Sequence, residues 1–358
     1  MALNASFNSA KNSKADEFYT LLTDIEKELK HYKHHFKDKT VFMNCDDPKE
    51  SNFWLYFSLN FGHLGLKKLI STHYEDDKPT YKLEMYYDIN GQQVIDQTDL
   101  EKNGDFRSPE SIKLLKEADI VVTNPPFSLF REYVDQLMKY DKKFLIIGSQ
   151  NNITYKEIFP LLMYNKVWLG FNSGGFEFEV PNKPPYNEKS TFRIDPETGK
   201  SYQKLGNICW FTNLEHSKRN EELILWKQYT KEEYPSYDNY NAIEVSKVKE
   251  IPVDYKDIMG VPITYLDSYN PNQFEILGIT TARYDLGEEG SPSKRYENAI
   301  QHNRDGSTTL GSKINTRAAI LYKEPVEGIY YTADNADGYL KAIYVRILIR
   351  RIQNENWA

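Results

Sequence analysis

The chain has 358 residues, enough for one large domain or two ordinary ones, and 40% of them are hydrophobic, which excludes an intrinsically disordered protein. Its net charge of −7, from 45 basic and 52 acidic residues, argues against nonspecific adhesion to nucleic acid but allows a local basic cleft. The two cysteines are too few for a disulfide framework or, alone, for a structural zinc site.

The first residues of the chain contain no apolar core of a signal peptide. No window of about 18 consecutive apolar residues occurs, so we expect no segment that spans a membrane. These features predict a protein of the cytoplasm.

Helical and strand patterns alternate along the first half of the chain. Phe18, Leu21, Leu22, Ile25 and Leu29 recur at three- and four-residue spacing, which predicts a helix over 14–36. Further helices are expected over 52–61 with Ser51 as its cap, from Ser108-Pro109 to 118, over 128–140 and over 154–165. Strands are expected over 40–45, 67–72, 119–123, 143–149 and 166–171, and a hairpin over 80–96 with its turn at Asn90-Gly91.

This alternation predicts an α/β fold with a mostly parallel, twisted sheet flanked by helices. Such sheets bind ligands at the carboxyl ends of their strands. The loops after Cys45 and Thr72 and the segment 124–127 should lie at that edge.

The pattern changes beyond about residue 172. The segment 172–206 is rich in Gly, Pro, Ser and Asn, with strands expected over 176–180 and 207–212. Irregular structure is expected over 230–275, a polar basic loop over 302–317, and a final strand over 341–352. We therefore predict a first domain over 1–175 and a second region over 176–358.

The strand over 119–123 ends in Asn124-Pro125-Pro126-Phe127. The Asn124 amide has an acceptor oxygen, each proline leaves its carbonyl as an acceptor, and Phe127 has a flat apolar ring. Two acceptors and a ring suit a planar group with an exocyclic amine, whose nitrogen then attacks an electrophilic methyl group. The alternative is that two prolines simply end the strand.

The order of several motifs resembles that of the EcoRI-type adenine-N6 DNA methyltransferases. The longest is DIVVTNPPFSLF at 119–130. The others are DEFYT at 16–20, NCDDP at 44–48, GDFRS at 104–108, DKKFLII at 141–147, WLG at 168–170, MGVPIT at 259–264 and RILI at 346–349. The match covers nearly the whole chain and is weakest across 78–100, 172–206 and 280–340.

The resemblance implies a Rossmann-like class I methyltransferase fold, S-adenosylmethionine as cofactor, and a C-terminal region that recognises the DNA target. It implies that Asn124 and Pro125 accept the amino hydrogens of an extruded adenine and that Phe127 stacks on the base. Pro126, whose ring fixes the backbone, is expected to stiffen the turn. It also implies cofactor contacts, which we expect from Phe18, Tyr19, Asn44, Asp46, Asp47, Glu75, Asp105, Phe106 and Asn124.

The loop after the first strand departs from most methyltransferases of this fold. Those proteins have a glycine-rich loop there, whereas residues 44–53 contain no glycine. The EcoRI-type family is similar to this chain at that point. The acid that usually binds the ribose hydroxyls after the second strand is also unclear, and Glu75 is the nearest candidate.

Two other interpretations concern metals and the C-terminal arginines. Asp46-Asp47 and the His31/His35 pair have the chemistry of metal ligands, but turn acids usually cap, and no ligand-spaced partner stands nearby, so no metal is expected. Arg346, Arg350 and Arg351 fit a solvated edge strand and phosphate contacts equally well.

The predicted function is site-specific methylation of adenine N6 in double-stranded DNA, in a restriction-modification or phage and host context. Phosphate contacts are expected from Arg304, Lys313, Arg317 and Arg346. A monomer is expected, because one strand is methylated at a time. The alternatives are the same chemistry on an RNA base or a protein glutamine, and a relic that binds DNA without turnover.

Overall fold

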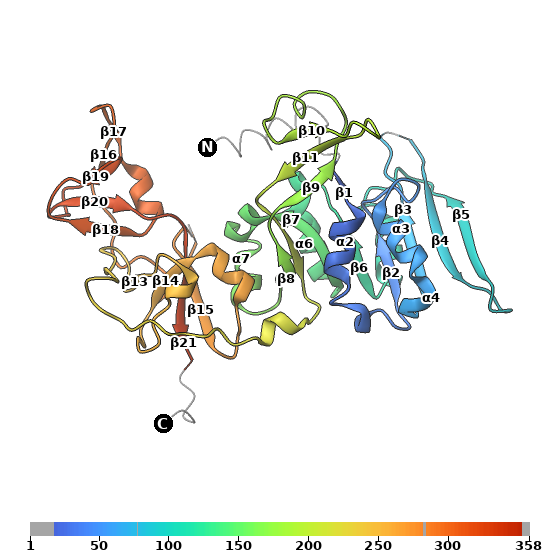
Figure 1. The fold of residues 1–358 in the computed structure, drawn as a ribbon, viewed down its shortest axis with the longest axis horizontal. Coiled ribbons are helices and arrows are strands. Elements are labelled where there is room, and N and C mark those ends of the chain that lie inside the picture. Colours follow the sequence, from blue (N-terminus) through green and yellow to red (C-terminus); the bar gives the residue numbers. More distant parts are fainter. Residues whose placement is uncertain (1–17, 77, 282–283, 353–358) are drawn as a thin grey trace. The chain divides into compact units, whose positions relative to one another are not determined.

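The computed structural model describes residues 18–76, 78–281 and 284–352, which form a mixed α/β structure (Figure 1). The chain divides into two compact units. Among the described residues, the first unit comprises 18–158 and 167–216, and the second comprises 159–166 and 217–352. Residues 14–17 of the predicted first helix lie outside the described residues.

An eight-stranded sheet forms the centre of the first unit (Figure 1). Its strands, in spatial order, are β5 (Gln93–Asp99), β4 (Tyr81–Tyr87), β3 (Lys68–Thr72), β2 (Thr40–Met43), β6 (Ile120–Thr123), β7 (Lys143–Ser149), β12 (Ile208–Thr212) and β8 (Trp168–Ser173). The pairings β3–β2, β2–β6 and β6–β7 are parallel, and the other four are antiparallel. The sheet is thus mixed rather than mostly parallel, because the β4–β5 hairpin extends one side and β12 returns antiparallel between β7 and β8.

Helices cover both faces of this sheet. On one face, α2 (Leu22–Leu29) and α3 (Asn52–Leu59) pack on alternate residues of the parallel strands, including Val41, Val122 and Leu145. On the other face, Phe130 of α6 (Phe130–Lys139) packs on Phe211 of β12, with ring centroids 4.9 Å apart. The alternation of strand side chains between the two faces explains why the parallel strands are apolar throughout.

The local signals at helix starts and turns are confirmed. The Ser51 hydroxyl accepts the Phe53 N–H at the start of α3 (3.1 Å), and the Ser108 hydroxyl accepts the Ser111 N–H at the start of α5, Pro109–Glu117 (3.1 Å). The hairpin between β4 and β5 turns at Asn90-Gly91, where Gly91 has a φ of +76°. A short helix α4 (Phe61–Leu64) follows α3.

Two predicted helices are shorter than expected. Tyr19 and Thr20 form a short strand, β1, that pairs with β9 (Phe176–Glu179), so the first helix begins only at Leu22 and is followed by the 3-10 turn η1 (Lys33–His35). Sheet pairing here overrides the helical pattern. Over 154–165 the structure has η3 (Gln150–Thr154) and then α7 (Phe159–Met163), where Pro160 occupies the first turn that tolerates proline.

The domain boundary predicted at 175 falls inside the first unit. A four-stranded sheet joins β1 and β9 to β11 (Ser201–Leu205) and β10 (Phe192–Ile194). β12 hydrogen-bonds to both β7 and β8, so the chain returns to the first sheet after 175. Strand pairing over long sequence distances therefore extends the first unit to residue 216.

The second unit contains two sheets. One has the order β13 (Ile243–Glu244), β14 (Met259–Pro262), β21 (Arg346–Arg351) and β15 (Phe274–Ile279). The other has the order β17 (Thr308–Leu310), β16 (Ile300–His302), β19 (Tyr330–Thr332), β20 (Tyr339–Ala342) and β18 (Ala319–Tyr322). The expected loop over 302–317 thus contains a hairpin, and the expected final strand is two strands. The remaining 3-10 turns within the described ranges are η2 (Phe127–Leu129), η4 (Ser217–Asn220), η5 (Val248–Glu250), η6 (Ile263–Ser268) and η7 (Ser312–Thr316).

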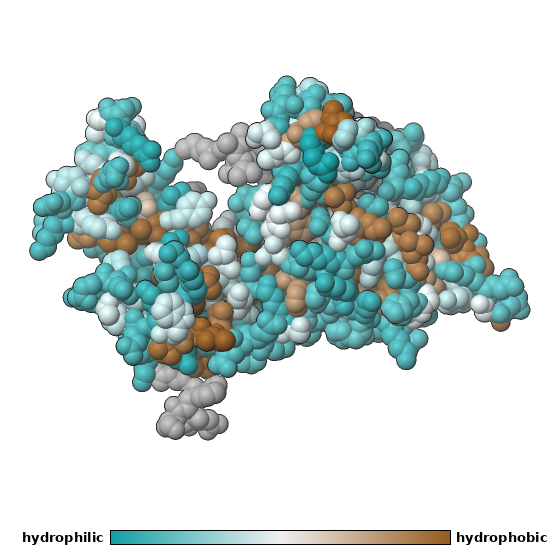
Figure 2. Space-filling view, viewed as in Figure 1, coloured by the Kyte–Doolittle hydropathy of each residue, from teal (hydrophilic) through white to brown (hydrophobic). Residues whose placement is uncertain are grey.

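Figure 2 shows a largely hydrophilic surface with apolar patches over α3 and the β4–β5 hairpin. The exposed large apolar side chains of these elements include Leu59 and Ile95. Among the described residues, no helix has the length and apolar character needed to cross a membrane.

Candidate active site

The carboxyl ends of β2 and β6 are joined by hydrogen bonds to Asp46. Its Oδ2 accepts from the backbone N–H of Asn124 (3.3 Å) and from the Thr123 hydroxyl. Its main-chain carbonyl accepts from the Ser71 hydroxyl of β3 (2.9 Å). The parallel order β3–β2–β6 brings these strand ends together, so the glycine-free loop after β2 is tied to both neighbouring strands.

Asp46 is a partly buried acid whose hydrogen-bond donors are neutral groups. Burial raises its pKa to about 6, although the donors of Thr123, Asn124 and Ser51 each act to lower it. Among the described residues Asp46 makes no ion pair. A carboxylate in this state is electrostatically suited to a cationic ligand group.

The Asn124 amide is satisfied at one end only. Its Nδ2 donates to the main-chain carbonyl of Phe18 (2.8 Å). Its Oδ1 is buried and has no hydrogen-bond partner among the described residues. Leaving a buried acceptor unpaired costs about 1–3 kcal/mol. The arrangement therefore holds an acceptor ready for a hydrogen-bond donor from outside the chain.

Aromatic rings surround the turn that follows Asn124. Phe127 is half-buried and stacks on Phe18, with ring centroids 5.4 Å apart and an interplanar angle of 29°. The edges of Phe178 and Tyr186 also meet Phe18. Pro125 is buried. The structure thus brings Phe18 to the Asn-Pro-Pro-Phe turn, whereas the neighbouring Tyr19 side chain is exposed.

Asn44 and Phe106 are buried near Tyr133 of α6. The Tyr133 hydroxyl donates to Asn44 Oδ1, and the Phe106 ring meets the Tyr133 ring edge-on at 5.1 Å. Burial raises the pKa of the Cys45 thiol and of the Tyr133 hydroxyl well above their ordinary values. Asn44 is therefore part of a buried polar network at the end of β2.

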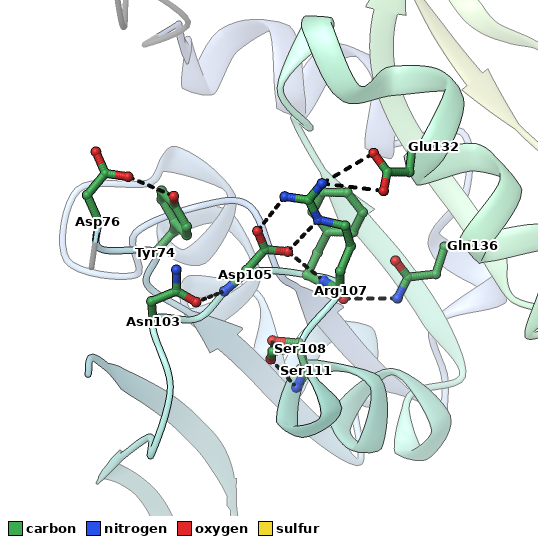
Figure 3. Close-up of polar contacts among 10 residues, drawn as sticks. Tyr74, Asp76, Asn103, Asp105, Arg107, Ser108, Ser111, Glu132 and Gln136 are labelled. Carbon is green, nitrogen blue, oxygen red and sulfur yellow. Dashed lines mark hydrogen bonds and ion pairs between the residues drawn. The ribbon is translucent and has the colours of Figure 1, made fainter. Parts of the chain in front are cut away.

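Asp105 lies in an ion-pair cluster (Figure 3). The Arg107 guanidinium donates from Nε to Oδ1 (2.9 Å) and from Nη2 to Oδ2 (2.7 Å), and Arg107 also pairs with Glu132 (3.3 Å). Hydrogen bonding from Arg107 is the main cause of a lowered Asp105 pKa. Both carboxylate oxygens of Asp105 are thus engaged. Gly104 supports this turn with a φ of +76°, and a Cβ there would clash with the His73 carbonyl.

Asp47 and Glu75 meet at His73, which follows β3. Asp47 accepts from the Tyr81 hydroxyl (2.7 Å), and its Oδ2 lies 3.6 Å from His73 Nε2. Glu75 lies 3.9 Å from the same nitrogen and 3.3 Å from the Lys78 ammonium. Glu75 therefore lies just beyond the predicted strand end, and its partly exposed carboxylate faces the Lys78 ammonium and the His73 imidazole.

Sequence reasoning missed several residues of this edge. Thr72 Oγ1 is buried without a partner among the described residues. Thr72 and Thr123 are the last residues of β3 and β6, a position that could have marked both. Phe178 lies in the strand predicted over 176–180, but nothing in that pattern linked it to the turn, and Tyr186 lies in a segment with little recognisable pattern.

The predicted phosphate contacts in the second unit differ in exposure. Arg304 and Lys313 are exposed, and the Arg317 guanidinium lies over the Tyr344 ring at 5.8 Å. Arg346 instead forms an ion pair with Glu244 (2.6 Å), with only 12% and 5% of the two side chains exposed. Because Glu244 pairs with this largely buried guanidinium, we do not expect Arg346 to contact phosphates, and we remove it from the predicted DNA contacts.

The edge-strand interpretation of the C-terminal arginines is wrong, because β21 lies between β14 and β15. Arg350 pairs with Glu275 (2.7 Å) and Glu289, and Arg351 donates to the Val253 carbonyl (2.6 Å). These arginines join β21 to its surroundings.

No group of three or more His, Cys, Asp or Glu side chains that could hold a metal occurs within the described ranges. His31 stacks on Phe171, and His35 hydrogen-bonds to the Glu215 carbonyl (2.8 Å). The two histidines are thus used in separate packing and hydrogen-bond contacts.

Residues 6–352 match the family model described as "Adenine-specific methyltransferase EcoRI". The chain is 50% identical to the Type II methyltransferase M.EcoRI of Escherichia coli, over 77% of this chain and 89% of that protein. It is 42% identical to M.MgeORF184P of Mycoplasma genitalium and 40% identical to M.MpnI of Mycoplasma pneumoniae, both Type II methyltransferases. Each alignment covers 78% of this chain and, respectively, 87% and 86% of the relative.

No solved structure matches the chain. The family model covers almost the whole sequence, including the Asn-Pro-Pro-Phe turn and Asp46 beside it. The chain therefore belongs to the EcoRI family of adenine-specific methyltransferases.

Proposed function

We propose how this site-specific DNA adenine methyltransferase performs the activity that its family membership establishes. The methyl donor is S-adenosylmethionine, and the acceptor is the N6 amine of an adenine turned out of double-stranded DNA. The observation that carries the proposal is the buried, unpartnered Oδ1 of Asn124 at the carboxyl end of β6.

Asn124 and Pro125 hold the amine in this proposal. Asn124 Oδ1 and the Pro125 carbonyl each accept one amino hydrogen, which draws the nitrogen toward a tetrahedral and nucleophilic form. Phe127 supplies the ring against which the base lies, and Pro126 keeps the turn stiff. Neither a metal nor a covalent enzyme intermediate is required.

The residues near Asp46 fit the proposed cofactor. When bound, S-adenosylmethionine supplies an electrophilic methyl group. Asp46 is a partly buried acid with a pKa of about 6 and no cationic partner in the described part of the chain, and it would hold the amino group of the cofactor. Asn44 supports this end through the Tyr133 hydrogen bond. The buried, unpaired hydroxyl of Thr72 is an additional polar group for the same ligand.

Asp105 and Phe106 would hold the adenine of the cofactor, and Asp47 and Glu75 its ribose. Arg107 donates to both oxygens of Asp105. To bind the adenine of the cofactor, Asp105 must therefore accept from the adenine and from Arg107 at the same time. We also propose that the first unit is a Rossmann-like class I catalytic domain. Within its mixed sheet, the four neighbouring strands β3–β2–β6–β7 are parallel, and their carboxyl ends carry the proposed catalytic site.

The second unit is proposed to recognise the DNA target, and the protein to act as a monomer in the cytoplasm. Arg304 and Lys313 are exposed cations suited to phosphates, and the partly exposed Arg317 is a third candidate. Replacing Arg304 or Lys313 by Ala should weaken binding similarly across DNA sequences and reduce the slope of log affinity against log salt by about 1. Arg346 is excluded because Glu244 holds it.

Methylation-aware sequencing of DNA from cells that express the protein tests the proposal and finds the target sequence. We expect N6-methyladenine at one short motif, absent from cells that express Asn124→Ala. Incubation with labelled donor and separate DNA, RNA and protein acceptors tests the substrate class. Label in RNA or protein alone would overturn the choice of DNA.

A further inference from the structure

We infer that the main-chain carbonyl of Phe18 sets the orientation of the Asn124 amide and thereby makes Phe18 a positioning residue of the active site. The inference rests on the proposed role of Asn124. It concerns the segment before α2, which the sequence had suggested as part of the cofactor site.

One hydrogen bond decides which end of the amide faces the base. Asn124 Nδ2 donates to Phe18 O at 2.8 Å, and Oδ1 is left buried without a partner among the described residues. A rotation of the amide by half a turn would place Oδ1 against the Phe18 carbonyl, and two acceptors repel. It would also turn the NH2 group toward the adenine amine, where two donors would meet. The Phe18 carbonyl thus selects the orientation that accepts.

The segment that carries this carbonyl is held by two elements, β9 and α3. Tyr19 and Thr20 of β1 pair with Glu179 and Phe178 of β9. Asn52, in the first turn of α3, donates from Nδ2 to the Thr20 carbonyl (2.8 Å). These contacts fix the main chain next to Phe18 without touching Asn124.

The Phe18 side chain supports the same turn in a second way. Its ring stacks on Phe127, and its other contacts are with the fully buried Phe178 and Tyr186. The carbonyl therefore orients the hydrogen-bonding residue of the turn while the ring supports the stacking residue. A displacement of Phe18 should disturb both.

This geometry requires an amide at position 124. An aspartate carboxylate would put an oxygen, with no hydrogen to donate, against the Phe18 carbonyl. Asp46, which contacts the Asn124 backbone, is a second acid nearby, so both neighbours favour the protonated form of a new carboxyl group. Only that protonated form can donate to Phe18 and still present an acceptor to the base.

The first experiment measures single-turnover methylation by Asn124→Asp from pH 5.5 to pH 8.5, divided by the wild-type rate at each pH. The division corrects for Asp46, which titrates in both proteins; the other titratable groups of this cluster are Cys45, Tyr133 and Asp105. We expect a ratio near that of Asn124→Ala at pH 8.5, rising up to about tenfold per pH unit as the new carboxyl group protonates.

Two outcomes of this experiment would overturn the inference. One is a ratio near unity at pH 8.5, which would show that no donor to Phe18 is needed. The other is a ratio that stays at the level of Asn124→Ala throughout, while cofactor affinity and melting temperature remain those of the wild type.

The second experiment loosens the segment from a distance and compares two matched variants. Asn52→Ala removes the amide that holds the Thr20 carbonyl. Asn60→Ala removes an amide that donates over the same distance, 2.8 Å, to the Tyr56 carbonyl of its own helix. We expect Asn52→Ala to lower kcat by about tenfold to a hundredfold, with cofactor Kd unchanged, and Asn60→Ala to leave kcat unchanged.

Equal kcat values for the two variants would contradict the inference. Failure of the proposed function can be distinguished from failure of the positioning role. In the first case the wild type itself would bind cofactor without methylating adenine in DNA. If the wild type methylates adenine and the variants do not behave as described, the positioning role alone is wrong.

Discussion

Asp46 and Asp105 are two carboxylates of the first unit with opposite electrostatic surroundings. Asp46 accepts from neutral donors, and burial raises its pKa to about 6. Asp105 accepts from the Arg107 guanidinium, which lowers its pKa. Asp46 also lies beside Asn124, whose Oδ1 has no partner in the described part of the chain, whereas both oxygens of Asp105 are engaged.

The surroundings of Asp46 are already arranged for a ligand, whereas those of Asp105 must rearrange before a ligand can bind. Around Asp46 the free protein carries the cost of burying polar atoms, and a ligand with complementary charge recovers that cost. Around Asp105 an existing ion pair competes with the ligand. We therefore expect larger losses of function from changes near Asp46 than from changes near Asp105.

Asn124→Ala should have the largest effect, because it removes the unpaired acceptor. We expect the single-turnover rate to fall roughly 10²–10⁴-fold, while cofactor affinity stays within a few-fold of the wild type. Rapid-quench methylation assays and fluorescence titration measure the two quantities. A single-turnover rate like that of the wild type would remove Asn124 from catalysis.

Asp46→Asn should weaken cofactor affinity about ten- to a hundredfold, because the amide loses the negative charge while it keeps an acceptor for Thr123. Isothermal titration of wild type and variant with the cofactor measures this loss. If the variant bound the cofactor as tightly as the wild type, the Asp46 carboxylate would not bind a cationic group of the cofactor.

The same variant should be more stable than the wild type at pH 7.5. Between pH 3.8 and about pH 6 the folded state keeps a proton that the unfolded state has lost, so the free energy of unfolding falls as pH rises through this window. Asn does not titrate and avoids this fall, which is about 3 kcal/mol for a pKa raised from 3.8 to about 6. Urea unfolding of both proteins at pH 4 and pH 7.5 tests it; a gain of equal size at both values would point to packing instead.

Asp105→Ala should weaken cofactor affinity about tenfold, less than Asp46→Asn, because the wild-type carboxylate already shares its oxygens with Arg107. The single-turnover rate at saturating cofactor should stay close to that of the wild type. If affinity falls more than a hundredfold, Asp105 is less constrained by Arg107 than Figure 3 indicates.

Arg107→Ala should have the smallest effect, since the guanidinium is 46% exposed. We expect cofactor affinity to change less than about threefold and the free energy of unfolding at pH 7 to fall by about 0.2–1 kcal/mol. The Asp105 pKa is depressed, so this stabilisation is present above pH 3.8 and is lost as pH falls through the folded pKa. Unfolding curves should show a smaller difference between wild type and variant at pH 3 than at pH 7.

The sequence by itself was sufficient for the short-range features. Ser51 and Ser108 cap their helices, Asn90-Gly91 turns its hairpin, and β7 has the predicted bounds of 143–149. Each depends on interactions between residues close in the chain, which a local pattern records. The Asn-Pro-Pro-Phe turn after an apolar strand likewise carried the chemistry and, with the other motifs, the family.

Only the tertiary structure decided which distant groups meet. β1 replaced the start of a predicted helix because its partner, β9, lies more than 150 residues away in the chain. The same pairing brings the Phe18 carbonyl to Asn124, and the β14–β21 pairing brings Arg346 to Glu244. Helical periodicity and residue type reflect local conformation and burial, whereas hydrogen-bond partners depend on how strands pair across the fold.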